Sequence, residues 1–116
     1  MKILIVDDMD VARVALRSAF ENEGFEVDEA KNGKQTILKV EKNNYDYVIL
    51  DLGLPDMNGI EILKKIKKLD RETKVIILTG ESEDKKIFNE AVLNGVQHYL
   101  LKPVNPKEIL GIIKNG

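Results

Sequence analysis

Short apolar stretches recur along the chain, separated by longer segments in which apolar residues return every three or four positions. Valine, isoleucine and leucine dominate the short stretches, and three of these are almost continuously apolar. Such runs are typical of strands covered on both faces. The predicted strands are residues 2–6, 25–30, 47–51, 74–79 and 98–102.

The longer segments have the spacing of amphipathic helices. The predicted helices are residues 10–23, 33–42, 59–69, 83–94 and 106–114. Asp10 and Ser82 are placed to cap two helix starts, and Pro106 suits the first turn of the last helix. The predicted stop signals are Gly24, Asn43-Asn44 and Asn94-Gly95.

Spacing also predicts which side chains of two helices share a face. In the first helix these are Val11, Val14, Ala15, Ser18 and Ala19. In the third they are Ile62, Leu63, Ile66 and Leu69. The lysines of "KKIKK" fall on the opposite face of the third helix, so we expect solvent around them rather than a phosphate ligand.

Strand and helix alternate five times, without a repeat or a linker, so the 116 residues predict one domain, 1–116. Such alternation requires right-handed crossovers and a parallel sheet with helices on both faces. We therefore expect an α/β fold of the flavodoxin-like, doubly wound type, with five strands in the order 2-1-3-4-5 and five helices. In this fold, ligands bind outside the carboxyl ends of strands 1 and 3.

Composition narrows the function classes. The absence of cysteine excludes disulfides and thiolate metal sites, and a single histidine argues against a zinc site or a histidine-based triad. The net charge is -2 and the lysines are dispersed, which gives no reason to expect direct nucleic-acid binding or a membrane surface as a partner. We find no signal peptide and no apolar run of membrane-spanning length, so we expect a cytoplasmic protein.

Polar side chains stand at the carboxyl ends of four predicted strands: Asp7-Asp8, Asp51, Thr79 and Lys102. Strands 1 and 3 are neighbours in the expected order, so the three carboxylates would crowd together. Like charges about 4 Å apart repel by roughly 4 kcal/mol at a protein surface. Lys102 and a hard divalent cation can offset this repulsion, and magnesium suits a site of a few carboxylates and water best.

A magnesium ion beside a carboxylate, a lysine and a hydroxyl is a combination of groups suited to phosphoryl transfer. Asp51 is the better candidate for the nucleophile, because it stands alone on the central strand while Asp7 and Asp8 are paired as ligands. Thr79 and Lys102 could each contact a phosphoryl oxygen.

Four motifs, in order and covering the whole chain, carry a family resemblance: "VDD", "LDLGLPDMNG", "LTGE" and "YLLKP". The chain resembles the receiver domain of two-component response regulators, including stand-alone chemotaxis regulators. The resemblance implies that Asp51 takes a phosphoryl group from a phosphohistidine on a sensor histidine kinase or histidine phosphotransfer protein. Asp8 and Asp51 would ligate Mg2+, Asp7 would hold the ion through water, and the backbone carbonyl of Gly53 would complete the site.

The resemblance also assigns a switch. Thr79 and Lys102 would bind the phosphoryl group. Tyr99 would turn inward when Thr79 is drawn toward the phosphoryl group. The surface of helix 4, strand 5 and helix 5 would then change for a downstream protein target or for an output domain removed from this chain. Such a domain is not an enzyme beyond its own phosphorylation and dephosphorylation. The peptide before Pro103 would be cis.

Three positions depart from the family's common pattern. Gly53 lacks the side chain often found there, while Glu81 carries one two residues after the threonine. These positions control the approach of water in the family, so they bear on the lifetime of the phosphoryl group. Val104 replaces the phenylalanine that often follows lysine-proline, which bears on packing near the output face.

Other functions compete with this interpretation. A flavin or nucleotide carrier of flavodoxin type shares the topology, but Asp7-Asp8 would repel its phosphate. A magnesium-dependent phosphatase of the dehalogenase type is suggested by the spacing of Asp8 and Asp10, yet the chain lacks the threonine motif and room for a cap domain. The remaining alternative is a receiver that works unphosphorylated as a docking module.

Overall fold

The computed structural model describes residues 1–80 and 84–115. Its strands are β1 (Lys2–Val6), β2 (Glu26–Ala30), β3 (Tyr47–Asp51), β4 (Lys74–Thr79) and β5 (His98–Leu101). Its helices are α1 (Asp10–Asn22), α2 (Gly33–Lys42), α3 (Gly59–Leu69), α4 (Lys85–Leu93) and α5 (Pro106–Asn115). Every predicted element is present, and no boundary differs by more than about two residues, the usual uncertainty of helix and strand ends.

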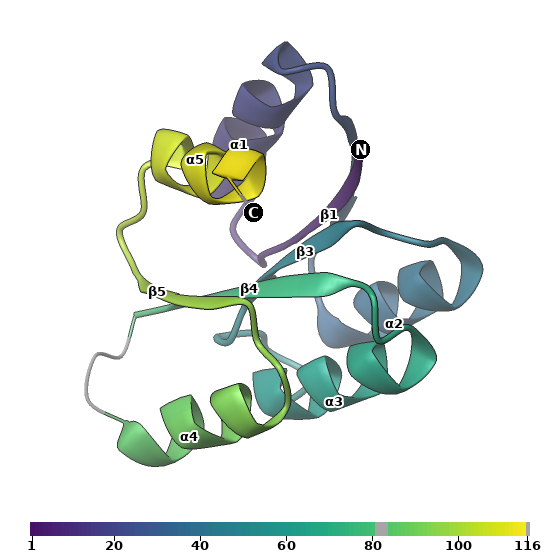
Figure 1. Ribbon diagram of the computed structural model, residues 1–116, viewed down its shortest axis with the longest axis vertical. Helices are drawn as coiled ribbons and strands as arrows, with labels where there is room; N and C mark the ends of the chain where they lie inside the picture. The colour runs from purple at the N-terminus through teal and green to yellow at the C-terminus, as the bar shows by residue number, and fades with distance from the viewer. Residues whose placement is uncertain (81–83, 116) are drawn as a thin grey trace.

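The five strands form one parallel sheet in the order β2-β1-β3-β4-β5. Helices α1 and α5 cover one face, and α2, α3 and α4 cover the other (Figure 1). This confirms the predicted flavodoxin-like fold and places the carboxyl ends of β1, β3 and β4 side by side. None of the described helices is long and apolar enough to cross a lipid bilayer.

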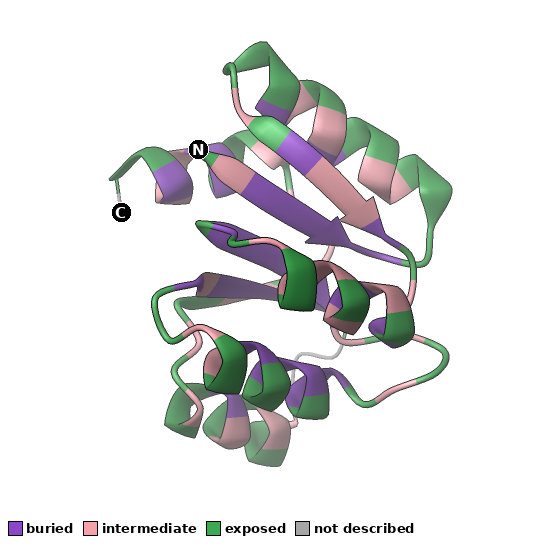
Figure 2. Cartoon of the chain, turned by 90° about the vertical axis from the view of Figure 1, so that its right-hand side faces the viewer, coloured by how far each residue is buried: buried purple, intermediate pink, exposed green. Residues whose placement is uncertain are grey.

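The core consists of two apolar layers separated by the sheet. Ile3 and Ile5 of β1 pack beneath α1 and α5, whereas Leu4 and Val6 face the other three helices. Figure 2 shows the buried residues concentrated in the strands between the helix layers. Burial on both faces explains the continuous apolar runs in the sequence, because every position of β3, and all but the first of β1 and β4, is buried.

Most of the predicted helix ends are confirmed. Gly24 and Gly95 follow α1 and α4 with φ values of 82° and 80°, a conformation that costs glycine little. The prediction for Asp10 is wrong: Met9 is the N-cap of α1, while Asp10 already lies in the helix and pairs with Arg13. At α4 the Asp84 side chain accepts the cap hydrogen bond. Ser82, the predicted cap, lies outside the described residues.

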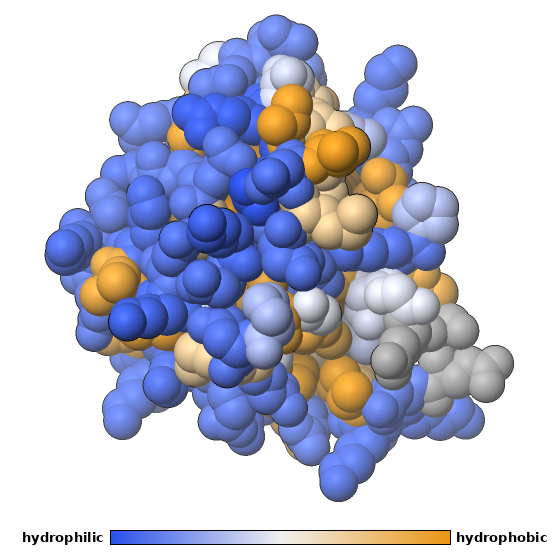
Figure 3. Space-filling view, turned by 180° about the vertical axis from the view of Figure 1, so that it is seen from behind, coloured by the Kyte–Doolittle hydropathy of each residue, from blue (hydrophilic) through white to orange (hydrophobic). Residues whose placement is uncertain are grey.

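The face of α1 that carries Val11 and Val14 is not the face that packs on the sheet. Val11 and Val14 are 79% and 61% exposed, whereas Leu16 and Phe20 are buried against the sheet. The apolar residues of α1 spread over more than one face, so two stripes fit the helical period, and the stripe with the larger side chains fills the core. In the view from behind, apolar side chains gather in the upper part, where α1 lies (Figure 3). Leu69, at the end of α3, is likewise 51% exposed.

Two tyrosines, one just before β3 and one at its first residue, lead to a stability prediction. The Tyr45 hydroxyl donates to Asp28 at 2.6 Å, whereas the buried Tyr47 hydroxyl has no hydrogen-bond partner among the described residues. Because a buried hydroxyl without a partner is unfavourable, Tyr47→Phe is expected to raise the free energy of unfolding by about 1 kcal/mol. Tyr45→Phe is expected to lower it by about 1 kcal/mol.

Urea unfolding of both variants measures this difference directly. The two substitutions remove the same atom from neighbouring positions, so each is the control for the other. Changes of the same sign in both variants would contradict the prediction.

Candidate functional site

The residues predicted at the strand ends meet at one edge of the sheet. Asp7 directly follows β1, Asp51 and Thr79 are the last residues of β3 and β4, and Lys102 directly follows β5. Asp51, Thr79 and Lys102 line a cavity of about 430 Å³. Its wall includes Asp8, Asp51, Gly53, Thr79 and Lys102. The parallel sheet thus brings together groups that are up to 95 positions apart in the sequence.

Three carboxylates lie together beside this cavity, and two of them, those of Asp8 and Asp51, line it. One oxygen each of Asp7, Asp8 and Asp51 lies within 4.8 Å of the other two. Asp7 and Asp51 are only 1% and 4% exposed, while Asp8 is open to solvent. An all-oxygen, strongly negative donor set that is open on one side fits a hard divalent cation that keeps some of its water.

Lys102 supplies positive charge from the far side of the site. Its Nζ lies 2.9 Å from Asp51 Oδ2 and 3.4 Å from Asp7 Oδ2. Burial alone would lower the pKa of Lys102, but the hydrogen bond to Asp51 and the charges of both carboxylates outweigh it, so the pKa is raised. Burial, helped by the charge of Asp51, raises the pKa of Asp7 against the lowering effect of the Met9 amide and Lys102.

Local backbone contacts fix the Asp51 carboxylate. The Gly53 N–H donates to Asp51 Oδ1 at 2.9 Å, and the Leu52 N–H donates to the Leu78 carbonyl at 3.1 Å, which continues the β3–β4 ladder. A Cβ atom at Gly53 would lie 3.5 Å from Asp51 Oδ1, which is ordinary contact. Glycine therefore leaves the approach to the carboxylate more open than any other residue would. Glu81 lies outside the described residues.

The loop after Asp51 is fastened to α2. Both carboxylate oxygens of Asp56 accept backbone N–H groups at the start of that helix, from Gly33 at 2.8 Å and from Lys34 at 3.0 Å. The bond from Gly33, then that from Lys34, lowers the pKa of Asp56 against its desolvation. Sequence reasoning missed this contact, since its only signal is an acid in a loop. It holds the segment that follows Asp51 in place.

Known proteins that resemble this chain identify its family. The family model for the response regulator receiver domain matches residues 3–114. The chain belongs to the response regulator receiver family. This confirms the resemblance drawn from the four motifs.

This receiver domain is similar to known response regulators both in sequence and in structure. The transcriptional regulatory protein SrrA of Staphylococcus aureus is 37% identical over 113 residues, which are 97% of this chain but only 46% of SrrA. The chain thus spans about half the length of this relative. A CheY-like receiver domain protein from Methanospirillum hungatei has a TM-score of 0.92 at 34% identity, covering 98% of this chain and 90% of its own.

One solved structure bears on the chemistry of receiver sites. A response regulator from Burkholderia pseudomallei contains a phosphorylated aspartic acid and a calcium ion. It is 25% identical, with a TM-score of 0.88, and the match covers 96% of this chain and 65% of that one. A divalent cation in this relative agrees with the donor set formed by Asp7, Asp8 and Asp51.

Three positions around β5 of the receiver domain carry further expectations from the sequence. The Lys102–Pro103 peptide is cis, as the resemblance implies. Tyr99 is half-buried, and its ring meets that of Phe88 on α4 edge to face, with 5.2 Å between the ring centres. Val104 is partly buried and packs with the layer formed by α1 and α5, away from α4.

Proposed function

We propose that this receiver domain accepts a phosphoryl group on Asp51 in a magnesium-dependent reaction, from a phosphohistidine on a sensor histidine kinase or histidine phosphotransfer protein. The support is the convergence of Asp7, Asp8 and Asp51 at the strand ends, with Lys102 Nζ 2.9 Å from Asp51. Such a site combines a nucleophile, a cation site and a fixed positive charge.

Each residue has a distinct role in the proposed transfer. Asp8 and Asp51, with the carbonyl of Gly53, would hold Mg2+ directly, and Asp7 would hold it through water. Bound Mg2+ would neutralise negative charge on the transferring oxygens. A carboxylate oxygen of Asp51 attacks phosphorus, forming the O–P bond while the N–P bond breaks and the histidine leaves with the bonding electron pair. Lys102 and the Thr79 hydroxyl then contact the phosphoryl oxygens.

The proposed output follows from this new charge. Thr79 and Lys102 contact the phosphoryl group in only one of the two states, and such a differential interaction is what shifts a two-state equilibrium. Tyr99 would move inward behind Thr79, changing the contact with Phe88 and hence the surface of α4, β5 and α5. A downstream protein or an output domain would bind this surface in one of its two states. A cytoplasmic location and the lack of direct nucleic-acid binding stay predictions from the sequence.

Intact mass spectrometry tests the proposal. The protein is incubated with acetyl phosphate, a small phosphodonor, in the presence of Mg2+ or of EDTA, alongside the Asp51→Asn variant. A mass gain of one phosphoryl group is expected only for wild type with Mg2+. If no gain occurs, the proposal fails and the alternative, an unphosphorylated docking module, takes its place as the hypothesis to test. If the gain persists in the variant, the nucleophile lies elsewhere.

A further inference from the structure

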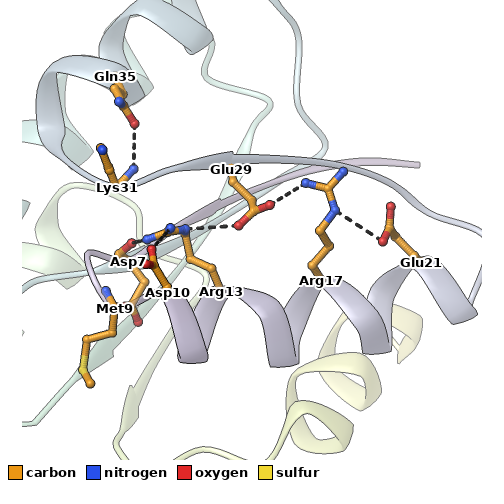
Figure 4. Close-up of polar contacts among 9 residues, drawn as sticks. All are labelled: Asp7, Met9, Asp10, Arg13, Arg17, Glu21, Glu29, Lys31 and Gln35. Carbon is orange, nitrogen blue, oxygen red and sulfur yellow. Dashed lines mark hydrogen bonds and ion pairs between the residues drawn. The ribbon is translucent and has the colours of Figure 1, made fainter.

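Arg13, on α1, contacts the main chain of the acidic site. Its Nη1 donates to the Asp7 carbonyl oxygen at 2.6 Å, as Figure 4 shows, and its side chain is only 12% exposed. The same guanidinium binds the carboxylate of Asp10 and, through Nε, Glu29 Oε1 at 3.1 Å. Nothing in the sequence pattern singles out Arg13, because a basic residue on an amphipathic helix usually faces solvent.

Glu29 on β2 anchors this contact. Its two oxygens accept from two arginines one helical turn apart: Oε1 from Arg13, and Oε2 from Arg17 at 2.5 Å (Figure 4). Arg17 is held by Glu21 as well, with 3.3 Å between Nε and Oε1. The two arginines therefore share an acceptor and a helix face. The difference that matters is that the contacts of Arg17 are with Glu21 and Glu29, whereas Arg13 also reaches Asp7.

Four hydrogen bonds fix Asp7. Its N–H donates to the Ala30 carbonyl at 3.1 Å, and its Oδ1 accepts from the Met9 N–H at 2.9 Å. Its Oδ2 accepts from Lys102 Nζ at 3.4 Å, and its carbonyl accepts from Arg13. For Asp8, by contrast, no hydrogen bond or ion pair holds the exposed side chain within the part of the chain that the structure describes. The position of the Asp8 carboxylate is thus set through the backbone, by the orientation of the peptide that joins it to Asp7.

We propose that Arg13 is a positioning residue for the divalent-metal site: its bond to the Asp7 carbonyl orients the Asp7–Asp8 peptide and keeps the Asp8 carboxylate beside those of Asp7 and Asp51. The inference rests on the proposed magnesium site. Groups that orient metal ligands in this way contribute strongly to affinity, because the ligands are then preorganised. Arg13 would act on the metal through Asp8 and not by touching it.

Charge alone predicts the opposite effect of removing Arg13. A positive side chain near a cation site repels the cation, so its loss would tighten magnesium binding. Loss of positioning would weaken binding instead. The sign of the change in affinity therefore separates the two roles.

The test is a titration with MgCl2 of wild type, Arg13→Met and Arg17→Met, followed by amide chemical shifts in NMR or by calorimetry. Arg17→Met is the matched control, since it removes the same group from the same helix face and from the same partner, Glu29. The dissociation constant of Arg13→Met is expected to rise about ten-fold. That of Arg17→Met is expected to stay near the wild-type value.

Each outcome is decisive. Unchanged or tighter binding in Arg13→Met would overturn the inference, as would equal weakening in both variants, which would assign the effect to the α1–β2 ion pairs in general. A wild-type protein that binds no magnesium would refute the proposed metal site and the inference with it. If Arg13→Met does not fold, Arg13→Lys replaces it: weaker binding than wild type is again expected, because lysine lacks the planar fork, and unchanged binding overturns the inference.

Discussion

Replacing Asp7 with asparagine is expected to stabilise the metal-free protein while weakening its binding of magnesium. The Asp7 carboxylate is almost fully buried, repelled by Asp8 and Asp51, and attracted by Lys102 at 3.4 Å. At an effective dielectric constant of about 20, two repulsions outweigh one attraction, and their removal is worth about 1–2 kcal/mol. Asparagine keeps an oxygen to accept the Met9 N–H. Urea unfolding in EDTA measures the gain.

The pH dependence of this gain has a definite sign. Burial, aided by the charge of Asp51, raises the pKa of Asp7 in the folded protein. A carboxyl group with a raised folded pKa contributes stability that is fully present below its unfolded pKa and is lost as the pH rises through the folded pKa. Asparagine does not titrate, so the advantage of Asp7→Asn should grow from acid to neutral pH. A variant less stable than wild type at neutral pH in EDTA would contradict the prediction.

Magnesium should reduce the stability advantage that Asp7→Asn has over wild type. A ligand that binds only the folded state stabilises it by an amount that grows with the ratio of ligand concentration to dissociation constant. Wild type is therefore expected to gain more stability from MgCl2 than Asp7→Asn does. Equal gains in the two proteins would show that Asp7 takes no part in holding the ion.

The second large effect is expected from Gly59→Ala, at the first residue of α3. A Cβ atom there would lie 2.3 Å from Leu52 Cδ2 and 2.9 Å from Leu52 Cα, distances that real Cβ atoms do not tolerate. Leu52 directly follows Asp51, so the backbone that carries the proposed phosphoacceptor must move. The free energy of unfolding is expected to fall by about 2–3 kcal/mol. Phosphorylation by acetyl phosphate, followed by intact mass, is expected to slow.

Gly111→Ala is the matched control for this substitution. Gly111 lies inside α5, and among the described residues nothing comes within 4 Å of a Cβ built there. Alanine in a helix interior is expected to raise stability by about 0.5–1 kcal/mol, because it restricts the unfolded chain more than glycine does. If Gly59→Ala behaved like Gly111→Ala, the close approach of α3 to Leu52 would not constrain the site.

The sheet and the acidic site could be predicted from the sequence because both follow from strongly patterned features. Continuous apolar runs such as residues 47–51 require cover on both faces, and a parallel sheet brings the strand ends to one edge. The buried face of α1 could not be predicted in this way. Val11 and Val14 fit the helical period as well as Leu16 and Phe20 do, and only three-dimensional packing chooses the larger pair.

Contacts between polar side chains and distant backbone atoms also escaped prediction. Asp56 binds amides 22 and 23 residues away, and Arg13 binds a carbonyl six residues before it. Hydrophobic periodicity carries no information on such pairs, because charged residues on helices and in loops mostly face water. They matter here because both hold segments on which the site residues stand.

The bonds from Asp56 to α2 have a consequence for observing the protein in solution. The Gly33 and Lys34 amide protons are covered only while the loop after Asp51 stays against the helix, since Asp56 is their acceptor. Their rates of exchange with solvent deuterium therefore report how often that loop moves away from α2. The exchange rates of these two amides at the start of α2 thus measure the motion of the loop beside the site. The measurement needs no label and no ligand in the cavity.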